Sequence, residues 1–438
     1  MKIKTKKLSY DSVIKLRRPL HLRPKKPNIF FRTLVRVASD GDLKNANFTY
    51  TFDKSERERA GDGPYLILMN HSSFIDLEIV SKIFYPEPYG IVCTSDGFVG
   101  KSWLMQQIGC IPTNKFVSDL TLIRDMKYML HDQKTSVLMY PEASYSFDGC
   151  ATPLPRRLGN LFRMLNVPVL MVKTAGAFTR DPLYNCLQKR QVDVSAEVTC
   201  LFSRDELAET SVDVLDKKLD DAFTFDNFAW QRDNKIAVNE PFRADGLERI
   251  IYKCAACGCE GKMRGSGTNL VCENCGKTWE LDKYGQLHAV SGGITEFSHI
   301  PDYYKWEREA VRREIENGEY SLDIPVEIGM LVDYRAIYMV GEGRLRHDEN
   351  GFTLDGCEGK LHYEQSTVTS YSLYSDYFWY ELGDMICIGK TDCLYYCFPT
   401  VPCAVAKTRI AVEELYKRKR SRKRNAADAP TPEGADAN

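Results

Sequence analysis

His71 and Asp76 are the residues of this sequence whose types and spacing suit catalysis best. They lie in the segment Tyr65–Asp76, YLILMNHSSFID, with four residues between them. Asp76 can hold the imidazole in one tautomer while the other ring nitrogen takes a proton from a substrate hydroxyl. No G-x-S-x-G elbow is present, so the expected nucleophile is the hydroxyl of the acceptor itself. A histidine that only caps a helix could have the same spacing to an aspartate. The choice between catalysis and capping therefore depends on other parts of the sequence.

The elements around the pair must bring the two side chains together. Residues 65–69 are mostly large and apolar, which predicts a strand buried on both faces, and the second apolar run, Leu77–Ile83, predicts a helix. Residues five apart lie about 140° apart on a regular helix. His71 is therefore expected in the turn before the helix, at the carboxyl end of the strand, where open α/β sheets bind their ligands.

Further apolar segments follow in alternation. Strands are predicted at 89–93, 136–140, 167–173 and 191–202, and helices at 102–108, 118–131, 158–165 and 211–225. Repeated alternation of strand and helix is typical of an α/β fold. We expect a mixed sheet with helices on both faces.

Four blocks together resemble a known family. NHSSFID resembles the first motif of the glycerolipid acyltransferases, the 1-acylglycerol-3-phosphate acyltransferase family. GCIPTNK, YPEAS and VPVLMV resemble the second, third and fourth motifs, and they follow in the same order over about Asn28–Val238. The resemblance implies transfer of a fatty acyl group from a thioester of coenzyme A or acyl carrier protein to a lysophospholipid hydroxyl, in phospholipid biosynthesis. His71 would be the base and Asp76 would orient it.

The resemblance also implies an acceptor-binding set. Lys115 stands where the second motif usually has the Arg that binds the acceptor phosphate, and a lysine pairs with phosphate as a point charge. Glu142 and Ser144 belong to the third block, where Glu142 would bind the acceptor hydroxyl or frame the site. Arg156 and Arg157 precede a predicted helix and could add positive charge.

Two departures from the third motif leave alternatives open. Ala143 replaces the usual Gly, and Tyr145 replaces the usual Arg. A Cβ atom at position 143 limits how closely the backbone can approach an oxyanion or a phosphate. The acceptor could therefore be a lipid without phosphate. A non-catalytic, membrane-bound scaffold is a further alternative, although the intact His71–Asp76 pair argues against it.

Four cysteines predict a metal site. Cys254 and Cys257 form one C-x2-C pair, and Cys272 and Cys275 form another. A glycine follows each second cysteine, and the pattern resembles a zinc ribbon. Four protein ligands leave no open coordination position, so the expected Zn²⁺ is structural. Few basic residues surround the pairs, and no nucleic acid partner is expected.

The chain divides by composition into six parts. The divisions are a basic N-terminal arm at 1–27, an acyltransferase domain at 28–248, a zinc ribbon at 249–285, a linker with a helix at 286–322, a β-rich domain with a C-terminal helix at 323–417, and a disordered basic and polar tail at 418–438. Several strands followed by one helix make the β-rich domain resemble a pleckstrin-homology-like barrel.

Charge and cysteine usage bear on location. The net charge is −1, but Met1–Arg36 is dense in Lys and Arg, which suits an anionic membrane surface. No run of 18 apolar residues and no signal peptide are recognised, and the 15 cysteines favour a reducing compartment. We therefore expect a cytoplasmic protein that is peripheral on the inner face of the cell membrane, docked through the basic arm and a helix at Asn28–Val37.

Overall fold

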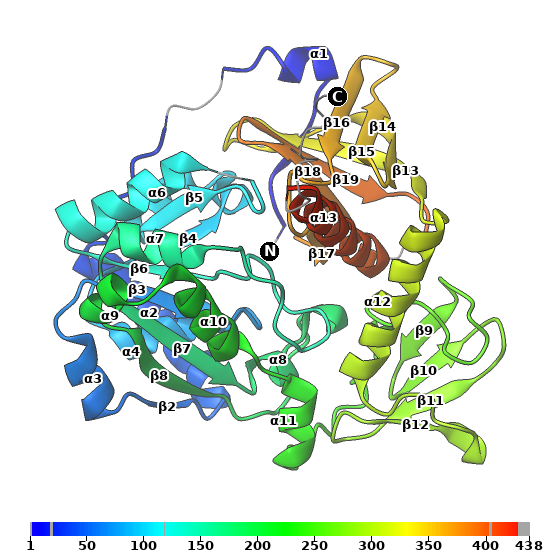
Figure 1. The fold of residues 1–438 in the computed structure, drawn as a ribbon, viewed down its shortest axis with the longest axis horizontal. Coiled ribbons are helices and arrows are strands. Elements are labelled where there is room, and N and C mark those ends of the chain that lie inside the picture. Colours follow the sequence, from blue (N-terminus) through cyan, green and yellow to red (C-terminus); the bar gives the residue numbers. More distant parts are fainter. Residues whose placement is uncertain (1, 18–20, 118, 403–404, 428–438) are drawn as a thin grey trace, which may run out of the picture.

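The first half of the chain is built on a seven-stranded sheet in the computed structural model, which describes residues 2–17, 21–117, 119–402 and 405–427 (Figure 1). In sheet order the strands are β2 (Thr49–Thr51), β8 (Ser195–Phe202), β7 (Val169–Ala175), β3 (Leu66–Met69), β6 (Ser136–Met139), β4 (Tyr89–Thr94) and β5 (Cys110–Thr113). Only β7 and β8 pair antiparallel. The predicted mixed α/β sheet is confirmed.

Helices cover both faces of this sheet. All four residues of the central strand β3 are fully buried, two against each face. One face packs against α2 (Ile29–Asn45) and α4 (Asp76–Phe84). The other face packs against α6 (Leu120–Lys127), α7 (Leu158–Leu165) and α10 (Val212–Phe223). The buried strand therefore ends between two helical layers, where it delivers His71.

Shorter helices complete this half, and two predicted helices have different lengths. The shorter ones are α3 (Lys54–Ala60), α5 (Ser102–Gln107), α8 (Ala177–Arg180), α9 (Arg204–Glu209) and α11 (Asn227–Asp233). The predicted 118–131 helix is α6 followed by a π-helical turn, Tyr128–Asp132, and residue 118 lies outside the described residues. The predicted 28–37 helix continues to Asn45 as α2. No helix in the described residues is long and apolar enough to cross a membrane.

A four-stranded antiparallel sheet follows. Its order is β12 (Leu287–Ala289), β11 (Thr278–Leu281), β10 (Asn269–Cys272) and β9 (Met263–Ser266). β12 lies just beyond the predicted end of the ribbon at residue 285. Trp279 is fully buried under this sheet.

The C-terminal part is a second, larger antiparallel sheet. Its strands are β13 (Leu322–Leu331), β14 (Ile337–Asp348), β15 (Gly351–Gly356), β16 (Leu361–Ser366), β17 (Tyr374–Trp379), β18 (Gly383–Lys390) and β19 (Cys393–Pro399). They form the path β16-β15-β14-β13-β19-β18-β17, in which β13 pairs with β19. The likeness to a pleckstrin-homology barrel stays a prediction.

Two long helices link this sheet to the rest of the molecule (Figure 1). α12 (Ile300–Asn317) packs against α13 (Val405–Ala427), and α13 also contacts β17 and β18. The tail predicted to be disordered from residue 418 is helical as far as Ala427, so that part of the prediction is wrong. Residues 428–438 lie outside the described part of the chain.

The predicted basic N-terminal arm is partly incorporated into the C-terminal sheet. β1 (Thr5–Lys7) pairs parallel with β14, and α1 (Tyr10–Val13) follows it. Val13 is buried in the core beneath that sheet, and Lys360 pairs with Asp11 at 2.5 Å. Backbone pairing can hold a strand of exposed, charged side chains, a possibility that composition does not reveal.

Candidate active site

The His71–Asp76 pair is formed at the carboxyl end of β3. His71 lies in the turn after the strand, and Asp76 is the first residue of α4. Nδ1 of His71 is 3.0 Å from Oδ2 of Asp76. The same oxygen accepts backbone N–H groups from Ser72 at 2.8 Å and Ser73 at 3.2 Å. The spacing thus places the histidine in the turn before the helix, as predicted.

Two tyrosines enclose the imidazole ring. The ring centre of His71 lies 4.1 Å from that of Tyr140 and 4.2 Å from that of Tyr145. The side chain of His71 is 17% exposed, and no described residue hydrogen-bonds its Nε2 atom. With Nδ1–H donating to Asp76, Nε2 is the open acceptor position.

Electrostatics favour a neutral imidazole. Burial lowers the pKa of His71 well below its usual value, and the charge of Lys115 lowers it further. Burial also raises the pKa of Asp76 to about 8, although the N–H groups of Ser72 and Ser73 oppose the rise. Because the two groups share a hydrogen bond, that value belongs to the pair. Loss of one proton from the pair leaves a neutral ring beside a carboxylate, which is the form that can act as a base.

Glu142 frames the site rather than facing an acceptor. One carboxylate oxygen accepts the backbone N–H of His71 at 2.8 Å. The other accepts the N–H and the hydroxyl of Thr152 at 2.9 and 3.2 Å. Burial raises the pKa of Glu142 to about 7. With its oxygens occupied by protein donors, the side chain fixes the backbone that carries the histidine.

Residues of the C-terminal half contact Lys115 and Ser144. Lys115 lies two residues after β5, and its Nζ atom is 4.4 Å from the ring centre of Tyr374. Burial lowers the pKa of Lys115, and the charge of Asp376 raises it. The hydroxyl of Ser144 accepts a hydrogen bond from Arg409 of α13 at 3.0 Å. The C-terminal half therefore closes over the second and third motifs.

Arg156 and Arg157 lie away from this cluster. Both side chains are exposed where α7 begins, and Arg156 is 3.6 Å from Asp220. The backbone N–H of Arg157 donates to Asp216. Among the predicted site residues, the structure thus brings together five, which are His71, Asp76, Lys115, Glu142 and Ser144.

The sequence analysis assigned no role to four side chains at this cluster, which are Tyr140, Tyr145, Tyr374 and Arg409. Tyr145 was noted only as a departure from a motif, although its ring packs on His71. Tyr374 and Arg409 gave no signal, because they reach the site only through the packing of distant segments.

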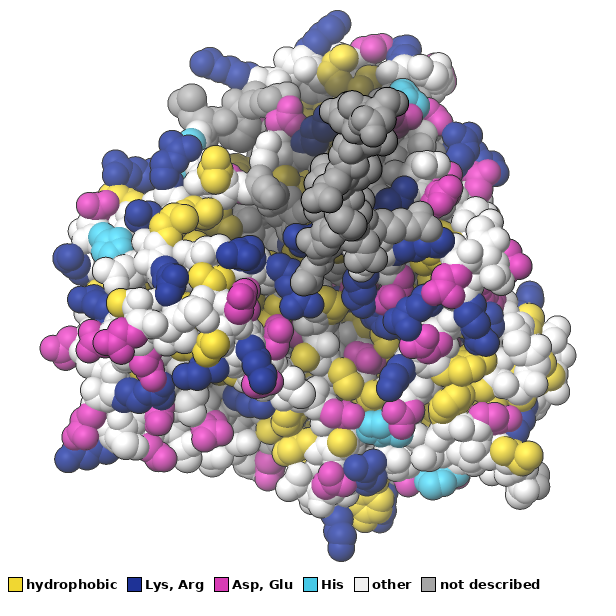
Figure 2. All heavy atoms as spheres, viewed as in Figure 1, with side chains coloured by type: hydrophobic (Ala, Val, Ile, Leu, Met, Phe, Trp, Pro, Cys, Tyr) yellow, Lys and Arg dark blue, Asp and Glu magenta, His cyan; other side chains and the backbone are white. Residues whose placement is uncertain are grey.

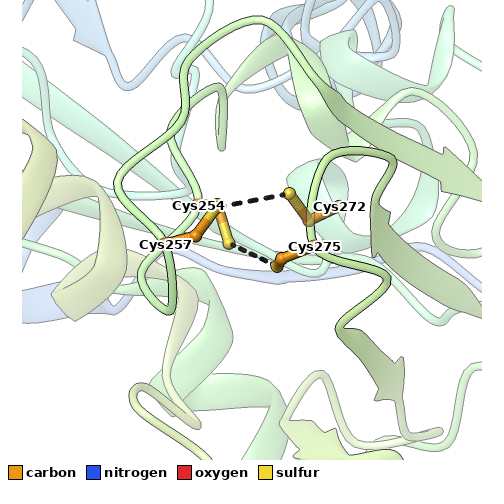
Figure 3. A group of neighbouring side chains, drawn as sticks. All are labelled: Cys254, Cys257, Cys272 and Cys275. Atoms are coloured by element: carbon orange, nitrogen blue, oxygen red, sulfur yellow. Dashed lines mark hydrogen bonds between the residues drawn. The ribbon is translucent and has the colours of Figure 1, made fainter.

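The four predicted cysteines converge from two loops (Figure 3). All four Sγ atoms lie within 4.8 Å of one another, and two pairs, Cys254–Cys275 and Cys257–Cys272, are 3.8 Å apart. Sulfurs about 2.3 Å from a tetrahedral ion are about 3.8 Å apart, so the cluster fits a metal ion. Cys259 is outside the cluster, as predicted.

Comparisons with known proteins address the class of this domain. The Acyltransferase family model matches residues 49–173, the segment that holds His71, Asp76, Lys115 and Glu142, and it supports acyl transfer as the chemistry of this segment. The crystal structure of the 1-acyl-sn-glycerophosphate (LPA) acyltransferase, PlsC, from Thermotoga maritima is similar over 42% of this chain and 78% of that chain, with 11% identity and a TM-score of 0.30. No curated protein matches the sequence.

Proposed function

We propose that this protein transfers a fatty acyl group from a thioester of coenzyme A or acyl carrier protein to the hydroxyl of a lysophospholipid such as 1-acylglycerol-3-phosphate, in phospholipid biosynthesis. One observation carries the proposal: the hydrogen-bonded His71–Asp76 pair, with Nε2 open, lies inside the segment that matches the Acyltransferase family model.

The geometry supports a direct transfer. Nε2 of His71 takes the proton of the acceptor hydroxyl as its oxygen attacks the thioester carbonyl carbon. The C–O bond forms, the tetrahedral intermediate collapses, and the C–S bond breaks. The departing thiolate receives the proton from the imidazolium ion, whose charge Asp76 stabilises. Every proton is accounted for without a protein nucleophile.

Acceptor binding falls to the groups near the imidazole. Lys115, with Nζ toward the C-terminal half, and the Ser144 hydroxyl are the candidates beside it. Arg156 and Arg157 are exposed, so in this proposal they meet only a head group or a membrane that approaches from outside. A lipid acceptor without phosphate is the competing choice, since Asp376 offsets part of the charge of Lys115.

The membrane contact is proposed for α2 and α5. Because β1 of the basic arm is paired with β14, we propose that an exposed apolar ridge, rather than the arm, contacts the membrane. The ridge consists of Ile29, Phe30, Leu34, Val37, Trp103 and Leu104, each at least 40% exposed. Apolar side chains of this kind can enter the interface of an anionic leaflet. In this proposal the protein is peripheral on the cytoplasmic face of the cell membrane.

The metal is proposed to be Zn²⁺ with a structural role. Four thiolates are the donor set that zinc prefers in closed sites, and all four coordination positions come from the protein. Positive-φ glycines, Gly258 and Gly276, let the two turns carry the cysteines inward.

Product analysis tests the function. Purified protein is incubated with acyl-coenzyme A or acyl carrier protein thioesters and a panel of acceptors, and the lipids are identified by mass spectrometry. The proposal predicts acylation of a lysophospholipid hydroxyl. Acylation of phosphate-free lipids alone would select the alternative acceptor, and absence of product with every pair would favour a scaffold.

A further inference from the structure

Arg409 is a buried cation that joins the two halves of the molecule. It lies on α13, 265 residues after Ser144, and its side chain is 3% exposed. Nη2 donates to the Ser144 hydroxyl at 3.0 Å, and the guanidinium carbon lies 4.3 Å from the ring centre of Phe147. Ser144 is two residues from Glu142, which holds the backbone of the histidine. The guanidinium group therefore reaches the third motif.

Part of this guanidinium group has no partner. Nη1 is buried and makes no hydrogen bond to any described residue. Glu413 accepts from Nε at 3.4 Å, but the same carboxylate faces Arg308 at 2.8 Å and the Ser372 hydroxyl at 2.7 Å. The charge of Arg409 also lowers the pKa of Asp148, which burial raises. A buried guanidinium N–H without an acceptor is costly, so it is free for an acceptor that arrives with a ligand.

A second, partly buried cation, Lys115, lies within electrostatic reach of Arg409. The charge of Arg409 lowers the pKa of Lys115, which burial lowers most and Asp376 and Asp96 raise. The charge of Lys115 in turn lowers the pKa of His71. The two cations are therefore within electrostatic reach of each other, and one of them reaches the catalytic ring.

A groove lies beside this region. Tyr304 and Tyr371, whose phenols lie within electrostatic reach of Arg409, line a groove of about 480 Å³, and so does Thr152. Its lining includes four cations, Arg156, Lys305, Arg308 and Lys417, and two acids, Asp148 and Asp220. Figure 2 shows Lys and Arg side chains along the junction between the two halves of the molecule.

We propose that Arg409, with Lys115, binds a phosphate group of a substrate at the acyl-transfer site. A guanidinium group suits phosphate because it presents several N–H donors in a planar fork. The C-terminal helix thus supplies a cation where the third motif offers Tyr145. The phosphate belongs either to the acceptor head group or to the carrier of the acyl donor. This inference rests on the proposed acyl transfer.

Four substrate pairs separate these sources. Acceptors are 1-acylglycerol-3-phosphate and monoacylglycerol, and donors are acyl-coenzyme A and the phosphate-free acyl N-acetylcysteamine thioester. Arg409→Gln should lower kcat/KM by roughly 10- to 100-fold, the size expected for loss of one hydrogen bond to a charged group. The loss should appear only with the partner that carries the bound phosphate. Arg409→Lys, which keeps the charge, should lose less with the same partner.

Arg312→Gln is the matched control, because Arg312 belongs to the neighbouring ion pairs of Glu414 and makes no side-chain hydrogen bond to the described residues of the first half. Its four kcat/KM values should stay within about twofold of the parent. Equal losses of Arg409→Gln with all four pairs, or no loss, would overturn the inference while leaving acyl transfer in place. If Arg409→Gln does not fold, Arg409→Lys decides by the same comparison.

Inorganic phosphate tests the site without turnover. Phosphate should raise the thermal unfolding temperature of the parent protein but not that of a folded Arg409→Gln or Arg409→Lys variant to the same extent. An equal rise in parent and variants contradicts the inference even if the parent shows no acyl transfer. Failure of the proposed function is seen separately, as absence of product from the parent with every substrate pair.

Discussion

The two halves of the molecule contribute to the site in different ways. In the first half, the His71–Asp76 pair lies within six residues of chain, and Glu142 follows the next strand of the same sheet. In the second half, Tyr374 comes from a strand and Arg409 from a helix, and both elements are far in sequence from the His71–Asp76 pair. The comparison teaches that local sequence can specify the chemistry, whereas packing between domains completes the surroundings.

The four-cysteine sheet is connected to this packing. The backbone N–H of Lys253, beside the first cysteine pair, donates to Glu307 of α12 at 2.8 Å. Lys407 of α13 binds Glu260 of the same loop and Glu314 of α12, each at 2.7 Å. Because Lys407 is two residues from Arg409, a change at the metal loop can reach the third motif through α12 and α13.

Among the variants that test how the two halves depend on each other, those that lose the metal should show the largest effect. The Cys254→Ser/Cys272→Ser double variant should lose the proposed Zn²⁺, and its C-terminal half should become protease-sensitive, since metal binding supplies much of the folding free energy of a small ribbon. Acyl transfer should fall at least tenfold because α13 is no longer held. Elemental analysis, limited proteolysis and product formation measure the three effects.

Cys259→Ser is the control for the ribbon, because Cys259 lies outside the cluster. It should keep one zinc per chain and parent activity. Full zinc retention by the double variant would show that the cysteines do not hold the metal, and full activity without zinc would show that the two halves are independent.

Membrane docking tests a role confined to the first half. Phe30→Ser/Leu34→Ser removes two side chains of the ridge that are 65% and 51% exposed. Burial of one such side chain is worth about 1.5–3 kcal/mol, of which docking recovers part, so binding to anionic vesicles should weaken roughly 10- to 100-fold. Turnover of a detergent-dispersed acceptor should not change.

Leu120→Ser is matched to this pair, because Leu120 is 77% exposed on α6, which covers the opposite face of the sheet from α2. It should bind vesicles like the parent. Equal sedimentation of the double variant and the parent with anionic vesicles would place docking elsewhere.

The pH dependence sharpens the assignment to the local pair. Below the apparent pKa of about 8, the His71–Asp76 pair holds one proton too many for His71 to act as a base. The value of kcat/KM should therefore fall about tenfold per pH unit below pH 8 and level off above it. Asp76→Asn removes the titrating carboxyl group, so its profile should lose this limb at a much lower rate. A limb near pH 7 that persists in that variant would assign the titration to Glu142, whose pKa is about 7.

Ala143→Gly should have the smallest effect. Ala143 has a φ of 56°, in the left-handed region that favours glycine. Relief of this strain competes with the greater freedom of glycine in the unfolded chain, so the free energy of unfolding should change by no more than about 1 kcal/mol. Denaturant unfolding measures it, and a loss of more than 2 kcal/mol would mean that the Cβ atom packs in a way the strain argument ignores.

The sequence predicted what local spacing determines. The His71 turn followed from helix geometry, and the cysteine cluster followed from two C-x2-C pairs, since neither depends on distant segments. Pairing of Thr5–Lys7 with β14 could not be predicted, because all three side chains are exposed and charge alone resembles a solvated arm. The contact of Arg409 with Ser144 had no local pattern either, since it exists only after α13 packs against the first half of the chain.

The most direct test of the central claim is the rate of acyl transfer by His71→Ala beside the parent protein. Loss of a general base typically lowers the rate about 10²- to 10⁴-fold, and we predict a loss of this size with unchanged zinc content and unfolding temperature. His362→Ala, an exposed histidine of the C-terminal sheet, should keep the parent rate. A rate for His71→Ala within a few-fold of the parent would contradict the account, because the pair at the end of β3 would then not perform the reaction.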